Sequence, residues 1–133
     1  MLGHTWRLRA SNTQNQSVTV TVKARRWKFA SDDSITWSAE QTLISAASLS
    51  ASTGTSASST VDNSTDKYIG AELTVSMTAS SATNGTGAVA CTIERSTDAG
   101  TTWPTQDKGE FVGAYTLVSG DGTNARLTNY RID

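Results

Sequence analysis

Short stretches of alternating apolar and polar residues recur along the chain, and no stretch keeps the 3.6-residue apolar period of a helix. The clearest alternation runs from Val18 to Ala24, where Val and Ala alternate with Thr and Lys. A second runs from Ile69 to Thr78. Because successive side chains of a strand point to opposite faces, this pattern predicts strands with one buried face. It favours an all-β protein.

Turn residues between the apolar runs divide the chain into about eight strands, a number typical of an antiparallel β-sandwich of jelly-roll or immunoglobulin-like type. The expected strands cover residues 5–10, 18–29, 40–44, 55–61, 69–78, 87–95, 111–118 and 125–132. Asn84-Gly85 predicts a hairpin between the strands 69–78 and 87–95. The last two strands are expected to form another hairpin around residues 119–124. The length of 133 residues fits one domain over 1–133.

The apolar phase changes within the second expected strand. Val18, Val20 and Val22 occupy even positions, whereas Trp27 and Phe29 occupy odd ones. Since one extra residue moves every following side chain to the other face, the change predicts a β-bulge near Arg25-Arg26.

Residues 45–65 have a biased composition, because twelve of these 21 residues are Ser or Thr and four are Ala. A segment with so few large apolar side chains contributes little core. It is either a mobile loop or the site of an edge strand. A structureless loop of this length is uncommon in a small domain, so we expect a short strand near Thr55 to Val61.

The charge balance limits the classes of partner. Eleven basic and twelve acidic residues give a net charge of −1, without the basic excess typical of nucleic-acid-binding proteins. The local cluster of Lys23, Arg25, Arg26 and Lys28 alternates along a strand, as on a solvated sheet face. No apolar run is long enough to span a membrane, and residues 1–9 lack the apolar region of a secretory signal. We expect a protein made in a host cytoplasm, with no nucleic-acid or membrane partner.

The sequence shows no catalytic, cofactor or metal constellation. The single cysteine, Cys91, lies at an apolar position of an alternating run and is expected to be a small core residue. The single histidine, His4, lies near the chain start, so neither a histidine metal site nor a nucleophile with its base is evident. Asp32-Asp33 is interpreted as a solvated corner rather than a Ca²⁺ loop. We therefore expect no enzyme activity, no cofactor and no metal.

Residues 96–103 carry the most specific signal, Ser-Thr-Asp-Ala-Gly-Thr-Thr-Trp. Short Ser96 and Asp98 side chains can bond nearby backbone N–H groups, and Gly100 can adopt a positive φ without penalty. Thr102 restarts the strand, and Trp103 is expected to anchor the turn in the core. All four contributions are local and structural.

This stretch resembles the Asp-box, S-x-D-x-G-x-T-W, at all five defined positions. The resemblance implies a β-hairpin turn that seldom does chemistry. In sialidase-like propellers the motif recurs once per blade, away from the active site. A blade takes roughly 40–50 residues and a propeller at least about four blades, so 133 residues are too few. We therefore reject a sialidase.

The wider stretch from Ile93 to Pro104, with the small-residue composition, resembles small accessory proteins of tailed-phage virions, such as capsid decoration and tail or baseplate proteins. The resemblance implies a virion location and many symmetric copies, bound to other virion proteins and to one another. Candidate interface residues are His4, Trp6, Arg25 and Arg26, together with the segment 45–65. Trp6 can equally be a core residue, and the segment a solvated loop.

An alternative function is that of a carbohydrate-binding module or the adhesive tip of a fibre, with a glycan as partner. Such domains present aromatic rings as stacking platforms, and an exposed coplanar pair of rings would favour this interpretation. The available rings are Trp27, Trp37, Trp103 and Tyr115, each of which can instead pack in the core.

Overall fold

The computed structural model describes residues 3–79, 85–104, 109–117 and 126–132, and these residues contain strands and no helix. The ten strands of this part of the chain are β1 (Thr5–Asn12), β2 (Val18–Phe29), β3 (Ile35–Trp37), β4 (Gln41–Leu49), β5 (Thr55–Ala57), β6 (Val61–Asp62), β7 (Gly70–Ala79), β8 (Val89–Ser96), β9 (Glu110–Tyr115) and β10 (Arg126–Ile132). The all-β prediction is confirmed. In the Ser/Thr-rich segment, two short strands, β5 and β6, replace the one expected.

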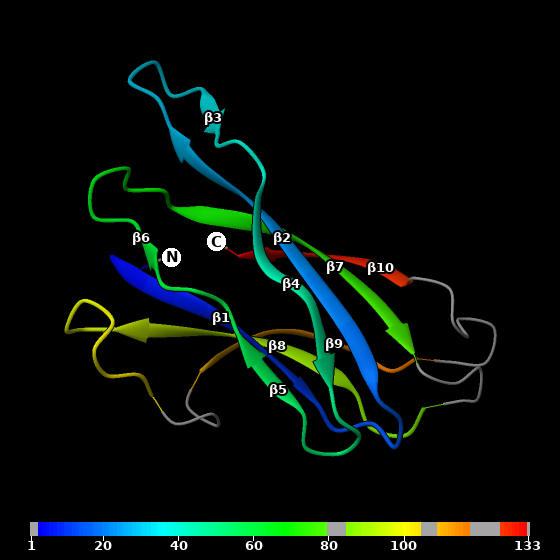
Figure 1. The fold of residues 1–133 in the computed structure, drawn as a ribbon. Helices are drawn as coiled ribbons and strands as arrows, with labels where there is room; N and C mark the ends of the chain where they lie inside the picture. The colour runs from blue at the N-terminus through cyan, green and yellow to red at the C-terminus, as the bar shows by residue number, and fades with distance from the viewer. Residues whose placement is uncertain (1–2, 80–84, 105–108, 118–125, 133) are drawn as a thin grey trace.

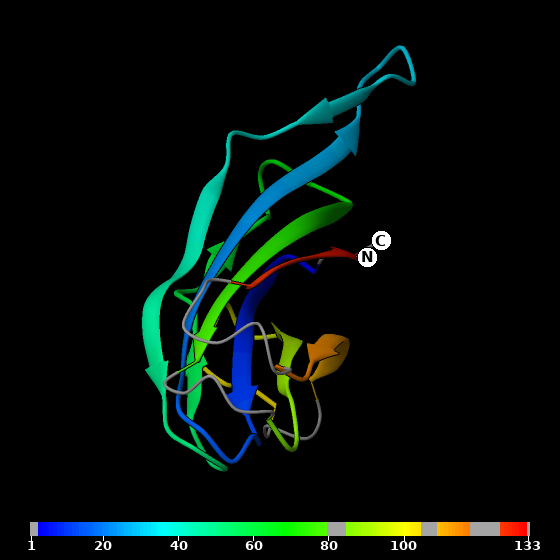
Figure 2. The same cartoon turned by 90° about the vertical axis from the view of Figure 1, so that its right-hand side faces the viewer.

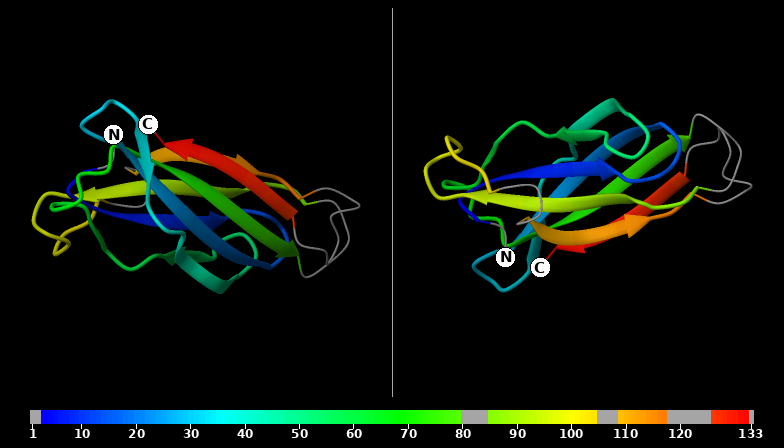
Figure 3. Two further views of the ribbon diagram at one scale, coloured as in Figure 1. Left: turned by 90° about the horizontal axis from the view of Figure 1, so that it is seen from above. Right: turned by 90° about the horizontal axis from the view of Figure 1, so that it is seen from below.

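The strands form two antiparallel sheets packed against each other, as a β-sandwich (Figure 1). Sheet 1 has the order β5-β1-β8-β9, with β6 also pairing with β1. Sheet 2 has the order β10-β7-β2-β3, with β4 also pairing with β2. Seen from above or below, the strands of the two sheets run obliquely across one another, as expected for twisted sheets (Figure 3).

The core consists of the inward-facing positions of the long strands, as the alternation predicts. From sheet 1 it takes side chains of β1 and β8, and from sheet 2 side chains of β2 and β7. The fully buried large residues include Trp6, Leu8, Val18, Val20, Val22, Leu73, Met77 and Ile93. Cys91 is also buried in this cluster, which confirms its expected place, and burial raises the pKa of its thiol to about 12.

Two predictions for the second half of the chain are wrong: β7 does not form a hairpin with β8, and β9 does not form one with β10. β7 lies in sheet 2 and β8 in sheet 1, and likewise β9 pairs with β8 while β10 pairs with β7. The connections therefore cross between the layers. Alternation reports that a strand has one buried face, but both sheets bury their inner faces in the same core, so the pattern does not reveal which sheet a strand joins. Residues 80–84 and 118–125 lie outside the described residues.

The bulge expected near Arg25-Arg26 is also absent, because β2 pairs with β7 in one unbroken register from Val18 to Trp27. The register shifts of β2 occur instead opposite β4, between Val20 and Lys23. β2 keeps its course and, with β3, extends past the rest of the sandwich (Figures 1 and 2). The apolar phase changes there because a strand that has left the sandwich no longer faces the second sheet.

Candidate functional site

The Asp-box-like turn after β8 is held by the side chains of its motif. Gly100 donates its backbone N–H to Ser96 Oγ at 2.9 Å, and Ser96 Oγ donates to Asp98 Oδ1 at 2.6 Å. The same carboxylate oxygen accepts the Thr102 backbone N–H at 2.8 Å. Hydrogen bonds from Ser96 and Thr102 lower the pKa of Asp98 to about 2. Ala99 and Gly100 both have positive φ, of 57° and 90°. The predicted turn roles of Ser96, Asp98 and Gly100 agree with this geometry. Thr102 does not restart a strand as expected: it lies in a bend, and the next strand of the described residues, β9, begins at Glu110.

Trp103 does not anchor this turn in the core, contrary to the expectation. Its side chain is half-buried on the outer face of sheet 1, where the Arg7 guanidinium carbon lies 4.3 Å from the ring centroid. Arg7 points outward from β1, because its neighbours Trp6 and Leu8 point inward. The ring is thus fastened to the sheet surface by a cation–π contact.

The contact with Trp103 lies next to a buried carboxylate. Glu94 on β8 is directly opposite Arg7 on β1 and is fully buried. It accepts hydrogen bonds from Arg7 Nε at 2.6 Å and Arg9 Nε at 2.5 Å. Burial alone would raise the pKa of Glu94, but the hydrogen bonds and charges of Arg9 and Arg7 outweigh burial and leave that pKa below its ordinary value. A carboxylate held ionised between two guanidinium groups is a structural ion pair, and it was not predicted from the sequence.

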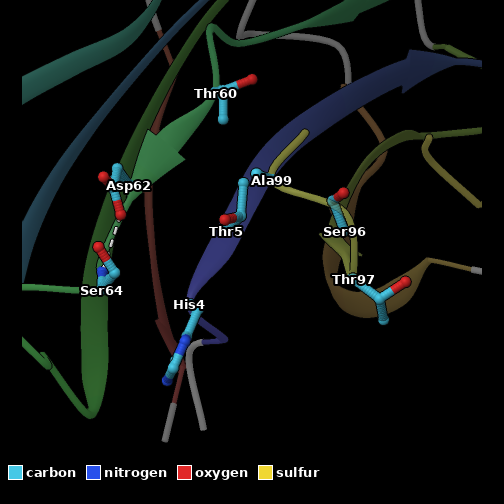
Figure 4. Close-up of a pocket in the computed structure, with 8 residues that line it drawn as sticks. All are labelled: His4, Thr5, Thr60, Asp62, Ser64, Ser96, Thr97 and Ala99. Atoms are coloured by element: carbon cyan, nitrogen blue, oxygen red, sulfur yellow. Dashed lines mark hydrogen bonds between the residues drawn. The ribbon is translucent and has the colours of Figure 1, made fainter. Parts of the chain in front are cut away.

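An open cleft of about 540 Å³ lies between the start of β1, the β6 region and the Asp-box turn (Figure 4). Hydroxyl groups dominate its lining, together with one histidine and one carboxylate. The lining residues are His4, Thr5, Thr60, Asp62, Ser64, Ser96, Thr97 and Ala99. The fold thus brings the predicted His4 close to the turn, although the two are far apart in the sequence.

Three of the polar residues of this cleft, Asp62, Ser64 and Ser96, are engaged in local structure. Asp62 accepts the backbone N–H of Ser64 at 2.8 Å, and the hydrogen bonds of Ser64 lower the pKa of Asp62. Ser96 Oγ is engaged in the turn. Neither serine is positioned as an activated nucleophile by these contacts. Among the described residues, no group of three or more His, Cys, Asp or Glu side chains could hold a metal ion.

The second candidate site is the protruding hairpin of residues 25–38, which we name the β2–β3 arm. Trp27 is opposite Trp37 and Phe29 is opposite Ile35, so four apolar side chains share one face. Phe29 is 54% exposed, Ile35 51% and Trp37 37%. Trp27 is buried against this group. Its ring meets the Phe29 ring edge-to-face, with the two ring centroids 5.7 Å apart and an interplanar angle of 81°. The arm therefore presents a strip of exposed apolar surface.

Gly70 explains how a tryptophan is buried on the outer face of sheet 2. Gly70 is directly opposite Trp27 in the β2–β7 register, and a Cβ atom at Gly70 would lie 2.5 Å from Trp27 Nε1. Only a glycine leaves room for the indole ring there. The Arg131 guanidinium carbon lies 5.4 Å from the ring centroid and completes the cover.

The opposite face of the arm is braced against the rest of the fold. The charged groups of Arg26 and Lys28 lie 4.6 and 5.1 Å from the ring centroid of Tyr68. Lys28 Nζ also donates to the Asp66 carbonyl oxygen at 2.9 Å. At the tip, the Ala30 N–H donates to the Ser34 carbonyl oxygen at 2.8 Å. These contacts tie one face of the arm to Asp66 and Tyr68 and leave the apolar strip on the other face.

The four predicted interface residues lie in different surroundings. His4 is exposed at the cleft, and Arg25 is exposed on the arm, 5.4 Å from the Trp37 ring centroid. Arg26 is half-buried against Tyr68. Trp6 is fully buried in the core, so its side chain does not reach the surface of this fold. Arg25, Arg26 and Lys28 of the predicted basic cluster are therefore divided between the two faces of the arm, and Lys23, outside the arm, pairs with Glu40 at 2.8 Å.

Phe29 and Ile35 are surface residues that were not predicted from the sequence. The signal was present, since the apolar phase change at Trp27 and Phe29 marks the point where β2 leaves the sandwich.

Comparisons with known protein families, with curated proteins and with solved structures find no match to this chain. The described part of the chain contains no helix long and apolar enough to cross a membrane.

Proposed function

We propose that this chain is a non-enzymatic structural protein of a phage virion, a capsid decoration protein or a tail or baseplate accessory. It acts through multivalent contacts with other virion proteins and with further copies of itself. The virion assignment rests on the resemblance of residues 93–104 and on the composition. The contact mechanism rests on one observation, the β2–β3 arm with its exposed apolar strip.

The arm supports an assembly role because it has three properties of a docking surface. It extends beyond the sandwich, so a partner can reach it (Figure 2). Its exposed side chains, Phe29, Ile35 and Trp37, include two of the aromatic types enriched in interface cores. Its opposite face is tied to Tyr68 and Asp66, so little conformational entropy is lost on binding.

The state of the reactive groups supports a function without turnover. The charge of Glu94 is compensated by ion pairs with Arg7 and Arg9, and Asp98 accepts a hydrogen bond within the turn. The Cys91 thiol is buried, and its raised pKa keeps it protonated at neutral pH. Each of these groups has a structural role that accounts for its position.

The alternative, a carbohydrate-binding module or fibre-tip domain, is favoured by one observation, the hydroxyl-lined cleft beside His4 and Asp62. The described residues that line this cleft include no Trp, Tyr or Phe side chain. On the arm, Trp27 and Phe29 meet nearly at right angles rather than in one plane. This pair therefore does not form the stacking platform that would favour a glycan, and the assembly function is better supported.

Density-gradient fractionation of a lysate of the source culture tests the proposal, with immunodetection of the chain. The chain should sediment with phage particles in a fixed ratio to the capsid or tail proteins. A triple variant, Phe29→Ser, Ile35→Thr and Trp37→Ser, should fold like the wild type but stay at the top of the gradient. Phe111→Ser, which removes an exposed aromatic of β9, is the matched control and should still sediment with particles. Wild-type protein found only at the top of the gradient, together with specific binding on a glycan array, would favour the alternative.

A further inference from the structure

The β2–β3 arm has opposite charges at its two ends. At its base, Arg25 lies opposite Glu72 of β7, which in turn lies opposite Arg131 of β10, so two basic groups and one acidic group leave the base with a positive charge. Its tip carries Asp32 and Asp33 in the turn that joins β2 to β3. The apolar strip lies between them. Along the arm, Phe29 lies between these charges, because Arg25 precedes it on β2 and the turn with Asp33 follows the Phe29–Ile35 pair.

We propose that the arms of two copies of this chain pair antiparallel about a two-fold axis near Phe29. This inference rests on the proposed function, because it names a second copy as one partner of the same surface. In this arrangement each apolar strip covers the other, and the acidic tip of each arm faces the basic base of its partner.

The apolar strip argues for a second copy as the occupant. An exposed apolar strip gains most from a partner that presents a similar strip. Among the described residues, the exposed large apolar side chains are Phe29, Ile35 and Trp37 on the arm and Phe111 on β9. The strip is thus the largest grouping of such side chains on the described surface. An isologous contact, in which the same patch is used twice, pairs this grouping with itself.

The charges select the direction of pairing. A parallel arrangement would place Arg25 beside the partner's Arg25 and the acidic tips beside each other, which is unfavourable. The antiparallel arrangement places Asp33 opposite the partner's Arg25 twice, once on each side of the axis. Hydrogen bonds from Ser34 hold the pKa of Asp32 below its ordinary value of 3.8, so this carboxylate keeps its charge even in mild acid. The charge pattern is therefore self-complementary in one orientation only.

The small size of the strip sets the strength of the contact. Three exposed side chains bury far less than the roughly 800 Å² per partner of a standard stable interface. We therefore expect a weak, reversible dimer in solution, with the contact strengthened when many copies are held on one particle. Because the end contacts are charge pairs, salt should weaken the dimer.

Analytical ultracentrifugation with two charge-reversal variants, Arg25→Glu and Asp33→Lys, tests the pairing. The first variant makes both ends of the arm acidic, and the second places a basic residue at each end. Each variant alone should dimerise at least about tenfold more weakly than the wild type. Arg25→Glu sets an acidic base against an acidic tip, and Asp33→Lys removes the attraction between tip and base, because its new basic group offsets the charge of Asp32. An equimolar mixture should recover association, because an arm with two acidic ends can pair with an arm that carries a basic residue at each end.

Three controls keep this test informative. Thr19→Lys, on the outer face of β2 but outside the arm, should leave dimerisation unchanged. Asp33→Asn removes the charge while suiting the positive φ of 62° at this position, and should weaken the dimer at low salt. Circular dichroism melts should show that every variant is folded.

Two results would overturn the inference: a wild-type chain that stays monomeric at millimolar concentration and low salt, or a mixture that associates no better than its components. If the arms do not pair but the chain sediments with particles through Phe29, Ile35 and Trp37, the proposed function stands without this inference. A chain that dimerises through its arms but never sediments with particles would support the pairing and contradict the virion assignment.

Discussion

At the scale of single residues, the buried Glu94 offers a direct test of the outer face of sheet 1. Removing one partner of a buried ion pair costs about 3–5 kcal/mol, because the remaining charges are left uncompensated. The Arg7 and Arg9 side chains keep 20% and 17% exposure, so we expect Glu94→Gln to cost about 3 kcal/mol, at the low end of that range. Urea unfolding at pH 7 measures the loss.

The same pair predicts an acid dependence of stability. The folded-state pKa of Glu94 is lowered, so its contribution is present above the ordinary value of 4.5 and is lost as the pH falls through the lowered pKa. The free energies of unfolding of the wild type and Glu94→Gln should therefore converge as the pH falls below 4.5. A difference that stays constant between pH 7 and pH 3 would show that the ionised carboxylate is not responsible.

Two tryptophans with different surroundings provide a second residue-scale prediction. Trp6 is fully buried, so Trp6→Ala should destabilise the fold by about 3–5 kcal/mol. Trp103 is half-buried and covered by Arg7, so Trp103→Ala should cost about 1–2 kcal/mol, mainly the cation–π contact. Equal losses in thermal or urea unfolding would contradict the placement of Trp103 outside the core.

The side chains that could be predicted at this scale are those with local roles. The bonds of Ser96 and Asp98 join groups within a few residues, so the order of residues determines them. Glu94 bonds arginines 85 and 87 positions away, and its burial depends on tertiary structure. No local pattern distinguishes it from an exposed strand glutamate, and for this reason it could not be predicted.

At the scale of elements, the Asp-box-like turn depends on Gly100. Its φ of 90° is unfavourable for other residues, and a Cβ atom there would lie 3.2 Å from Thr60 Cγ2. Gly100→Ala should therefore destabilise the fold by more than about 1 kcal/mol. Thr97→Ala, an exposed change in the same turn, should be close to neutral in the same thermal melt. Equal melting temperatures for both variants would contradict the strained turn.

The β2–β3 arm shows what an apolar pattern reveals about an element and what it omits. From Trp27 onward the apolar residues of β2 do lie on the other face of the strand, as the sequence indicates. The sequence alone could not show whether a bulge or a strand that leaves the sandwich causes this change. The pairing of β2 with β7 decides between them, because its register is continuous through Arg25 and Arg26. The sequence does contain Gly70, but its role under Trp27 follows only from the register.

At the scale of the whole molecule, the sandwich was predictable and its topology was not. Period-two alternation and frequent turns determine that strands of this length pack in two layers. Assigning each strand to a sheet requires long-range pairing, which is why two expected hairpins are crossovers between the layers. The arm and the cleft are built from different residues of the sandwich, so the two candidate sites can be tested separately.

Hydroxyl-radical footprinting of the chain, free and on purified particles, tests the central claim most directly, because it reports side-chain exposure residue by residue. We predict that Phe29, Ile35 and Trp37 are oxidised in the free protein and protected on the particle. Phe111 should stay reactive in both states, and Trp6 unreactive in both. Arm side chains that remain as reactive on the particle as in solution would contradict the account, as would protection confined to His4 in the cleft.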